Sequence, residues 1–323
     1  MLDFIFERPG KGIYLFSVLI MEKAYLKKFF LLMAFTLALV YLAGVYKPKP
    51  ISSTIQKEKF WAEKTHSNSR YNVIFIGDSR LYRGIDPKTV SKRLNGLKIL
   101  NFGYSSGGHN EVIFDEISMR FVGSDRTRAV VMVLSPYSLT PKAQENSHFN
   151  QEKTRNERDV FNRRFIAPFF DFFDPVKPSE ILKSNDTIQG YHEVFRPDGW
   201  VESYKIPSNP EHALKVYVND FKDNKVSQEV LNKVYVQVKE WKKQGIQVFG
   251  FRIPTTKAME KLEDSISGYK ENEIRMNFEK AGGEWINIDD RYGYVSYDGS
   301  HLERKSAIRF SDYIGNEIQK RMN

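Results

Sequence analysis

From Asn72 to the end of the chain, short apolar runs alternate with stretches whose apolar residues recur at helical spacing. Runs of this length and composition are typical of buried strands. Strands separated by helices favour a parallel sheet with helices on both faces. The pattern predicts a three-layer, flavodoxin-like α/β domain over residues 72–323. Its expected strands are Val73–Ile76, Leu97–Phe102, Ala129–Leu134, Ile246–Ile253 and Glu284–Ile288.

Three helices of this domain can be placed from their ends and periodicity. Asp86-Pro87 reads as an N-cap followed by proline at the first helical position, and this helix should end near Leu94. A second helix is expected over Ser227–Gln244, where apolar residues recur along one face and Gly245 follows. A last amphipathic helix is expected over Ser306–Met322.

Residues 138–223 break this alternation and are rich in Phe, Asn, Arg and Pro. We expect a helical or irregular insertion that covers a site or offers a surface to a partner. An ordinary peripheral helical layer is the alternative that the sequence leaves open.

An uncharged run of 18 residues, Phe29–Tyr46, precedes the domain. As a helix it would be roughly 27 Å long, close to the thickness of a bilayer core. Lys23, Lys27 and Lys28 precede it, which by the positive-inside rule predicts a cytoplasmic segment 1–28 and an extracytoplasmic domain. We therefore expect a transmembrane anchor at 29–46 and a polar stem at 47–71, with a short helix around Lys57–Lys64.

Two alternatives to an uncleaved anchor are a buried core helix and a cleaved signal peptide. The run is long for a signal peptide, and no Ala-x-Ala site closes it. A shorter apolar run, Ile13–Met21, comes earlier. Met21-Glu22-Lys23 is a more ordinary start for a signal-anchor, which makes Met21 an alternative translation start to Met1.

The amino-acid composition narrows the set of possible functions. The chain of 323 residues is 41% hydrophobic and 14% aromatic, enough to bury a core. It has no cysteine, which excludes disulfides, thiolate metal sites and cysteine nucleophiles. The net charge of +9 comes without a recognisable nucleic-acid-binding motif. An anionic membrane face, an acidic polymer or a merely solvated basic surface fits the charge.

Candidate chemistry lies at both ends of the domain. The first strand leads directly into Gly77-Asp78-Ser79, and Asp298 and His301 follow the last strand. In an open α/β sheet, ligands bind beyond the carboxyl ends of the strands, so these segments should meet. A serine hydroxyl needs a base, and an imidazole needs a carboxylate to fix its tautomer. We expect Ser79 as nucleophile, His301 as base and Asp298 as its orienting acid.

Other residues near this edge could hold a substrate. Gly103 and Gly107 could bring backbone N–H groups to a developing oxyanion, and the Ser79 N–H could add another donor. Arg80 and Arg252 could bind an anionic or carbonyl-bearing substrate. Each arginine could equally form a structural salt bridge, and Arg83 has the same two readings.

These motifs resemble those of the SGNH/GDSL hydrolases. Gly77-Asp78-Ser79 looks like the family's first block, and Asn101 to Gly108 is similar to its second, with one residue more between the two glycine positions. Asp298-Gly299-Ser300-His301 matches the fifth block, Asp-x-x-His. The third block, Gly-x-Asn-Asp, is absent, since Ser135-Pro136-Tyr137-Ser138 follows the third strand. The resemblance implies ester chemistry through an acyl-serine, but with an incomplete oxyanion hole.

The predicted layout has an N-terminal anchor, a domain outside the cytoplasm and no third-block asparagine. In this layout the chain resembles the bacterial envelope acyltransfer proteins of the family. That likeness implies a cell-envelope polysaccharide or glycolipid as substrate and a membrane-embedded acyltransferase as partner. A plain carbohydrate esterase or deacetylase with the same residues is one alternative. A non-catalytic anchored assembly factor is another, and simple binding of an anionic polymer is a third.

Single residues have competing readings. Gly103 to Gly107 is also a Gly-x-Ser-x-Gly string, which makes Ser105 a rival nucleophile. Asp289 and Asp290 could replace Asp298 as the orienting acid. We expect His109 to be a surface or helix-start residue. No metal or other cofactor is expected, because the remaining histidines lack partners at metal-ligand spacing.

Overall fold

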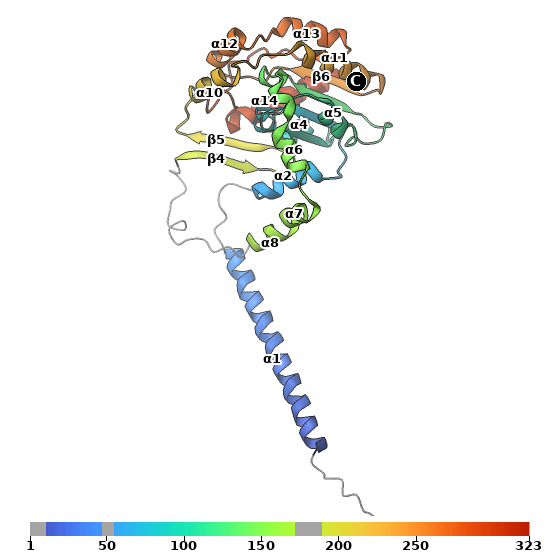
Figure 1. The fold of residues 1–323 in the computed structure, drawn as a ribbon, viewed down its shortest axis with the longest axis vertical. Coiled ribbons are helices and arrows are strands. Elements are labelled where there is room, and N and C mark those ends of the chain that lie inside the picture. Colours follow the sequence, from blue (N-terminus) through green and yellow to red (C-terminus); the bar gives the residue numbers. More distant parts are fainter. Residues whose placement is uncertain (1–10, 47–54, 172–188, 323) are drawn as a thin grey trace, which may run out of the picture. The chain divides into compact units, whose positions relative to one another are not determined.

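The computed structural model describes residues 11–46, 55–171 and 189–322 (Figure 1). The chain divides into two compact units, which we call the helical unit (residues 1–49 and 169–183) and the α/β unit (50–168 and 184–323). Parts of the predicted cytoplasmic segment, stem and insertion lie outside the described residues. Each unit is described by itself.

The helical unit contains α1 (Lys11–Tyr46), a single helix of 36 residues. Its window Tyr25–Leu42 has a mean hydropathy of 1.7, and none of the window is buried. Among the described residues this is the one helix long and apolar enough to cross a membrane. The window begins before the predicted span 29–46 and overlaps most of it. The alternative of a buried core helix is wrong.

The α/β unit is built on a five-stranded sheet in the order β2-β1-β3-β6-β7. All its neighbouring strands run parallel, and Val73 of β1 faces both Ile99 and Ala129. Numbered within the sheet, this is the 2-1-3-4-5 order of flavodoxin-like folds. The predicted parallel α/β architecture is confirmed. The strands are β1 (Val73–Gly77), β2 (Ile99–Gly103), β3 (Ala129–Val133), β6 (Gln247–Phe251) and β7 (Glu284–Trp285).

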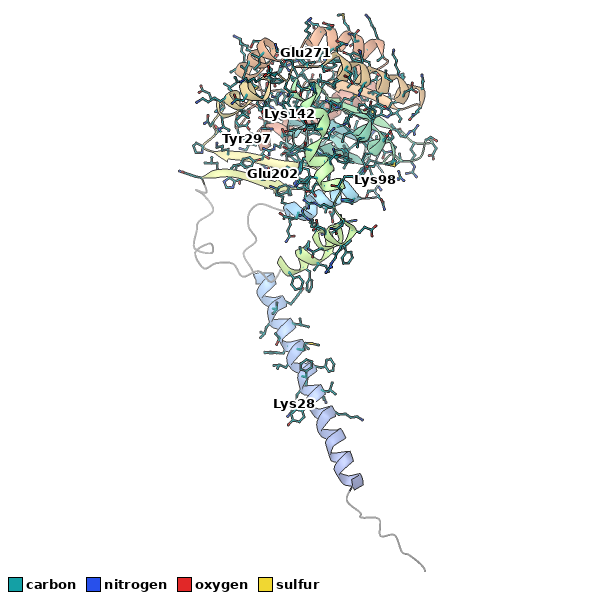
Figure 2. The ribbon with its side chains drawn as sticks, viewed as in Figure 1. Lys28, Lys98, Lys142, Glu202, Glu271 and Tyr297 are labelled. Atoms are coloured by element: carbon teal, nitrogen blue, oxygen red, sulfur yellow. The ribbon has the colours of Figure 1, made fainter. Side chains whose placement is uncertain are left out.

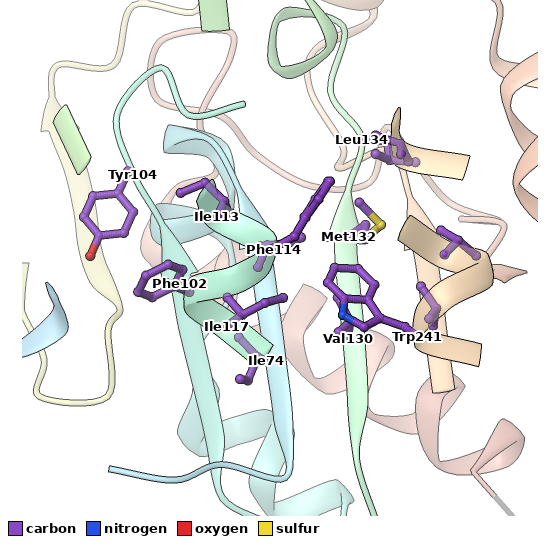
Figure 3. Packing of buried hydrophobic residues seen from close by; sticks show 14 of the residues in the cluster. Ile74, Phe102, Tyr104, Ile113, Phe114, Ile117, Val130, Met132, Leu134 and Trp241 are labelled. Carbon is purple, nitrogen blue, oxygen red and sulfur yellow. The ribbon is translucent and has the colours of Figure 1, made fainter. Parts of the chain in front are cut away.

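Alternate strand residues enter two separate hydrophobic clusters, as expected when side chains point to opposite faces. On one face, Ile74, Val130 and Met132 pack with Phe114 and Trp241 from helices (Figure 3). Helices α2 (Lys57–His66), α5 (Glu111–Ser118), α11 (Gln228–Lys243) and α13 (Glu271–Lys280) cover this face. The other face is covered by α3 (Ser79–Gly84), α4 (Pro87–Arg93) and α14 (Arg304–Arg321). The result is three layers.

Helix α2 corrects the predicted stem. Phe60 and Trp61 are 1% and 5% exposed and belong to the core cluster. Residues 57–66 are therefore part of the α/β unit. The sequence indicated a helix here. Because polar residues flank the helix, the sequence did not indicate that one side of it is buried.

The predicted insertion is more ordered than expected. It contains η1 (Tyr137–Leu139), η2 (Lys142–Glu145), α6 (Ser147–Lys153), α7 (Glu157–Phe161), η3 (Asn162–Ile166), α8 (Ala167–Asp171) and α10 (His212–Asp220). It also contains an unpredicted antiparallel hairpin of β4 (Gly190–Phe195) and β5 (Val201–Ile206). Phe149, Trp200 and Val201 join the core clusters, so much of this region is a packed peripheral layer. The remaining helix, α12 (Lys257–Ile266), follows β6.

Candidate active site

Ser79 lies at the carboxyl edge of the sheet, where the strand order reverses between β1 and β3. Strand β1 ends at Gly77, and Ser79 begins α3. The Asp78 carboxylate caps this helix by accepting a hydrogen bond from the Arg80 N–H at 3.0 Å and another from the Ser135 hydroxyl. Asp78 thus has the structural role of holding the turn that presents Ser79.

The structure brings Ser79, His301 and Asp298 together. Ser79 Oγ lies 2.9 Å from His301 Nε2, and His301 Nδ1 lies 2.7 Å from Asp298 Oδ2. A carboxylate only accepts hydrogen bonds, so Nδ1 carries the proton and Nε2 is left to accept from the hydroxyl. A hydroxyl, imidazole and carboxylate in this order can generate a serine nucleophile.

The loop that carries the acid and the imidazole is held by its own hydrogen bonds. Asp298 Oδ1 accepts from the N–H groups of Ser300 and His301 at 2.9 and 2.8 Å. Gly299 adopts a φ of +99°, and a Cβ at this position would lie 2.0 Å from the Pro210 carbonyl oxygen. Only glycine fits both the conformation and the close approach. The loop geometry therefore fixes Asp298 against His301.

Electrostatics favour a neutral His301 beside an ionised Asp298. Burial lowers the pKa of His301, and the positive charges of Arg83 and Arg80 lower it further, against the opposing effect of Asp298. Burial alone would raise the pKa of Asp298, but attraction to a protonated His301 and the hydrogen bonds that His301 and Ser300 donate outweigh burial and bring that pKa below its usual range. An unprotonated imidazole is the form that can accept a proton from Ser79.

The predicted glycine donors are already engaged. The Gly103 N–H donates to Asn101 Oδ1 at 3.2 Å, and the Gly107 N–H donates to the Tyr104 carbonyl at 3.2 Å. Gly103 instead permits close packing, since a Cβ there would lie 2.9 Å from the Asp78 carbonyl oxygen. The prediction that Gly103 and Gly107 supply oxyanion donors is therefore not supported. The Ser79 N–H remains, because the first N–H of a helix has no intrahelical acceptor.

The two arginines predicted as substrate ligands are structural. Arg80 and Arg252 are 1% and 2% exposed, and both bind Glu263. Arg80 donates to both carboxylate oxygens of Glu263, at 3.2 and 2.6 Å, and Arg252 donates to one at 3.0 Å. Two guanidinium groups that share a fully buried carboxylate hold α3, β6 and α12 together. They are not available to a substrate in this arrangement.

Sequence reasoning missed an aromatic cluster beside His301. The Tyr297 ring stacks on the His301 ring with centroids 5.9 Å apart, and Tyr191 of the hairpin lies 5.7 Å from Tyr297. Figure 2 shows Tyr297 next to β4 and β5. Arg83 donates to the Tyr297 hydroxyl at 2.5 Å and to Glu193 at 3.0 Å. The hairpin thus borders the site, and its strands carried no motif that could have placed them there.

The rival residues do not assemble a second site. No hydrogen bond of the Ser105 hydroxyl to a histidine or carboxylate is present among the described residues, and Ser105 is exposed. Asp289 and Asp290 are exposed, while Asp298 holds the imidazole. His109 is fully buried rather than at the surface, and burial lowers its pKa to about 4. The described residues contain no cluster of three or more potential metal ligands.

No protein-family model matches this chain, and no curated protein matches it. Similar solved structures include the two described next. One, from Streptococcus pneumonia, is provisionally described as a platelet activating factor, with 12% identity over 79% of this chain and 89% of that chain, at a TM-score of 0.34. The other is Est24, a carbohydrate acetylesterase from Sinorhizobium meliloti, with 11% identity, 78% and 99% coverage and a TM-score of 0.32. Such low TM-scores indicate a distant likeness, so what those proteins do does not transfer to this chain.

Proposed function

We propose that this protein is a membrane-anchored serine acyltransferase that acts on O-acyl esters of a cell-envelope glycan or glycolipid. The observation that carries the proposal is the continuous hydrogen-bond path from Ser79 through His301 to Asp298, with distances of 2.9 and 2.7 Å. These distances are those of a nucleophile and base poised for proton transfer. The resemblance to SGNH motifs at Ser79, Asp298 and His301 supports the same chemistry.

In the first half of the reaction, Ser79 Oγ attacks the ester carbonyl carbon while His301 Nε2 takes the hydroxyl proton. Asp298 keeps the proton on Nδ1 and stabilises the imidazolium that forms. The Ser79 N–H is the donor available to the oxyanion. The tetrahedral intermediate then loses the alcohol of the donor ester, which receives the proton from His301. An acyl group remains on Ser79.

In the second half, a hydroxyl of the acceptor sugar attacks the acyl-serine, and His301 takes its proton. The acyl group moves to the acceptor, and the proton returns to Ser79. Water in place of the sugar would give hydrolysis. We favour transfer because the chain lacks the third-block asparagine and because Gly103 and Gly107 use their N–H groups internally. Fewer oxyanion donors slow attack by either nucleophile. An acceptor hydroxyl held by the site regains rate through proximity, and a free water does not.

The cellular location of the α/β unit is the second part of the proposal. The apolar window Tyr25–Leu42 of α1 would hold the chain in the membrane, with Lys23, Lys27 and Lys28 supporting a cytoplasmic N-terminal side. The α/β unit would then face the envelope, where O-acylated polysaccharides and glycolipids occur. An acyl donor on the far side of the membrane would require a membrane-embedded acyltransferase as partner.

The test is a two-acceptor assay with the full chain in detergent, using an aryl acetate as donor and either water or an envelope oligosaccharide as acceptor. We expect acetylated oligosaccharide to form faster than free acetate, with both products lost in Ser79→Ala and His301→Ala. A rate of acetate release that does not change when the oligosaccharide is added would identify an esterase. If the chain shows neither activity, and the variant with both Ser79→Ala and His301→Ala still supports envelope acylation in cells, the protein is an assembly factor.

A further inference from the structure

Helices α7 and η3 of the α/β unit form a surface element with an unusual composition. Although they include Val160, Phe161, Phe165 and Ile166, none of their residues is buried. Phe161, Phe165 and Ile166 are 56%, 53% and 40% exposed. Helices in globular proteins are stabilised by burying an apolar face, and this one leaves its bulkiest apolar residues in solvent. No described part of the protein buries this apolar face.

The exposed residues form one patch. The Phe161 and Phe165 rings lie side by side with centroids 5.1 Å apart, and Ile166 is adjacent in sequence. We call these three residues the aromatic patch. Clustered exposed apolar residues of this kind mark a surface that binds something, whereas single exposed apolar residues need no explanation.

Residues 155–166 carry four arginines and two acidic residues, Glu157 and Asp159, so the net charge around the patch is +2. The Arg164 guanidinium lies 5.2 Å from the Phe165 ring centroid, and Arg158 is exposed one turn before Phe161. The nearby carboxylate of Asp159 is neutralised by Arg155 and Arg163, at 3.1 and 3.2 Å. Aromatic rings flanked by arginine are suited to the bilayer interface, where rings enter the acyl boundary and cations meet anionic headgroups.

Chain connectivity limits how far the start of α2 can lie from the end of α1. Helix η3 packs against α2, and α2 is the first helix after α1 along the chain. The chain between Tyr46 and Lys57 can extend at most about 40 Å. If α1 crosses the bilayer, the start of α2 stays within that distance of the membrane surface. The helix that carries the patch is a direct neighbour of α2.

We propose that the aromatic patch is a second membrane contact, which rests the α/β unit on an anionic bilayer surface through Phe161, Phe165 and Ile166. Attachment through α1 alone would leave open which side of the unit faces the lipid. Two attachments fix which side of the unit faces the lipid. The inference needs the span of α1, which is part of the proposed function, but it does not need the chemistry of Ser79.

The test uses the absence of cysteine from the chain, which makes any introduced cysteine a unique labelling site. We would place an environment-sensitive fluorophore at Phe165→Cys or Phe161→Cys in the full chain, reconstituted in phosphatidylcholine–phosphatidylglycerol vesicles. Val236→Cys, on α11, is the matched control, because Val236 is apolar and 60% exposed, and no other large apolar residue of α11 is exposed. Lipids with nitroxide on the acyl chain serve as quenchers.

We expect severalfold stronger quenching at 161 and 165 than at 236, with a blue-shifted emission that weakens in vesicles without phosphatidylglycerol. Equal, weak quenching at all three positions would overturn the inference. So would burial that grows with the number of protein copies per vesicle, which indicates self-association, or burial seen only in native membranes, which indicates a protein partner. Fluorophosphonate labelling of Ser79 in the same samples reports separately on the proposed function.

Discussion

Ser79 Oγ and His301 Nε2 lie 2.9 Å apart, although 222 residues separate them in the sequence. The parallel sheet explains the meeting, because the carboxyl ends of its strands share one edge. Ser79 follows β1 directly, and His301 precedes α14, the helix that covers the same face as α3.

Asp298→Asn should lower kcat/KM for an aryl acetate by about 10⁴-fold, because an amide no longer holds the imidazole in the tautomer that accepts from Ser79. The N–H groups of Ser300 and His301 can still donate to the amide oxygen, so the loop should keep its fold. Asp289→Asn is the matched control and should leave the rate unchanged. Equal losses in both variants would mean that Asp298 is not the orienting acid.

The rate should depend on pH through His301. Burial and neighbouring arginines lower the pKa of His301 from 6.5, so the imidazole stays neutral at pH 7 and becomes protonated only at lower pH. We expect kcat/KM to be level near neutrality and to fall as pH falls through an apparent pKa below 6.5. Arg83→Gln removes a positive charge that lowers this pKa. The fall of kcat/KM on the acid side should therefore occur at higher pH in Arg83→Gln. An unmoved midpoint would contradict the electrostatic account.

Glu263→Gln should strongly destabilise the fold, because Arg80 and Arg252 would lose the carboxylate that both of them bind. Removing one member of a buried ion pair typically costs about 3–5 kcal/mol. The exposed Glu240, paired with Lys243 at the surface, provides the control, and Glu240→Gln should change the free energy of unfolding little. Denaturant unfolding of the full chain in detergent would measure both. Stability retained in Glu263→Gln would reopen a substrate-binding role for the arginines.

Gly299→Ala should disturb the site without touching any reacting group. Its Cβ would overlap the Pro210 carbonyl oxygen, and its φ of +99° is unfavourable for alanine, so the loop carrying Asp298 and His301 must shift. Gly268→Ala is the matched control, since Gly268 also has positive φ, +75°, but open space around it. We expect a loss of more than tenfold in kcat/KM for Gly299→Ala and little change for Gly268→Ala. Similar rates in the two variants would show that the loop tolerates the shift.

Much of the sheet could be predicted because its strands are fully apolar and their flanking helices carry clear caps and periodicity. Asp86 caps α4 as expected, by accepting from the Lys88 N–H at 3.1 Å. The meeting of Ser79 with His301 followed from topology alone. Strands β3, β6 and β7 end one to three residues before the predicted ends, because apolar character continues past the strand, as at Ile253 after β6. Strands β1 and β2 instead run one residue further than predicted, to Gly77 and Gly103.

The rest depends on contacts that leave no local signal. Gly103 looked like an oxyanion donor, but its N–H is taken by the Asn101 side chain. Arg80 and Arg252 were open to a substrate-binding or a structural role, and the buried Glu263 between them favours the structural one. A signal for Glu263 existed, since it falls one turn after Met259 on the buried face of α12 and a carboxylate there requires a cation. The β4–β5 hairpin had none, because its strands mix polar and apolar residues and lack the continuous apolar run that marked the strands of the sheet.

The central claim is that Ser79 is a nucleophile activated by His301, and fluorophosphonate labelling of the full chain tests it most directly. We expect a covalent adduct on the peptide that contains Ser79, its disappearance in Ser79→Ala and its persistence in Ser105→Ala. Undiminished labelling of Ser79→Ala would contradict the account and move the reactive hydroxyl elsewhere.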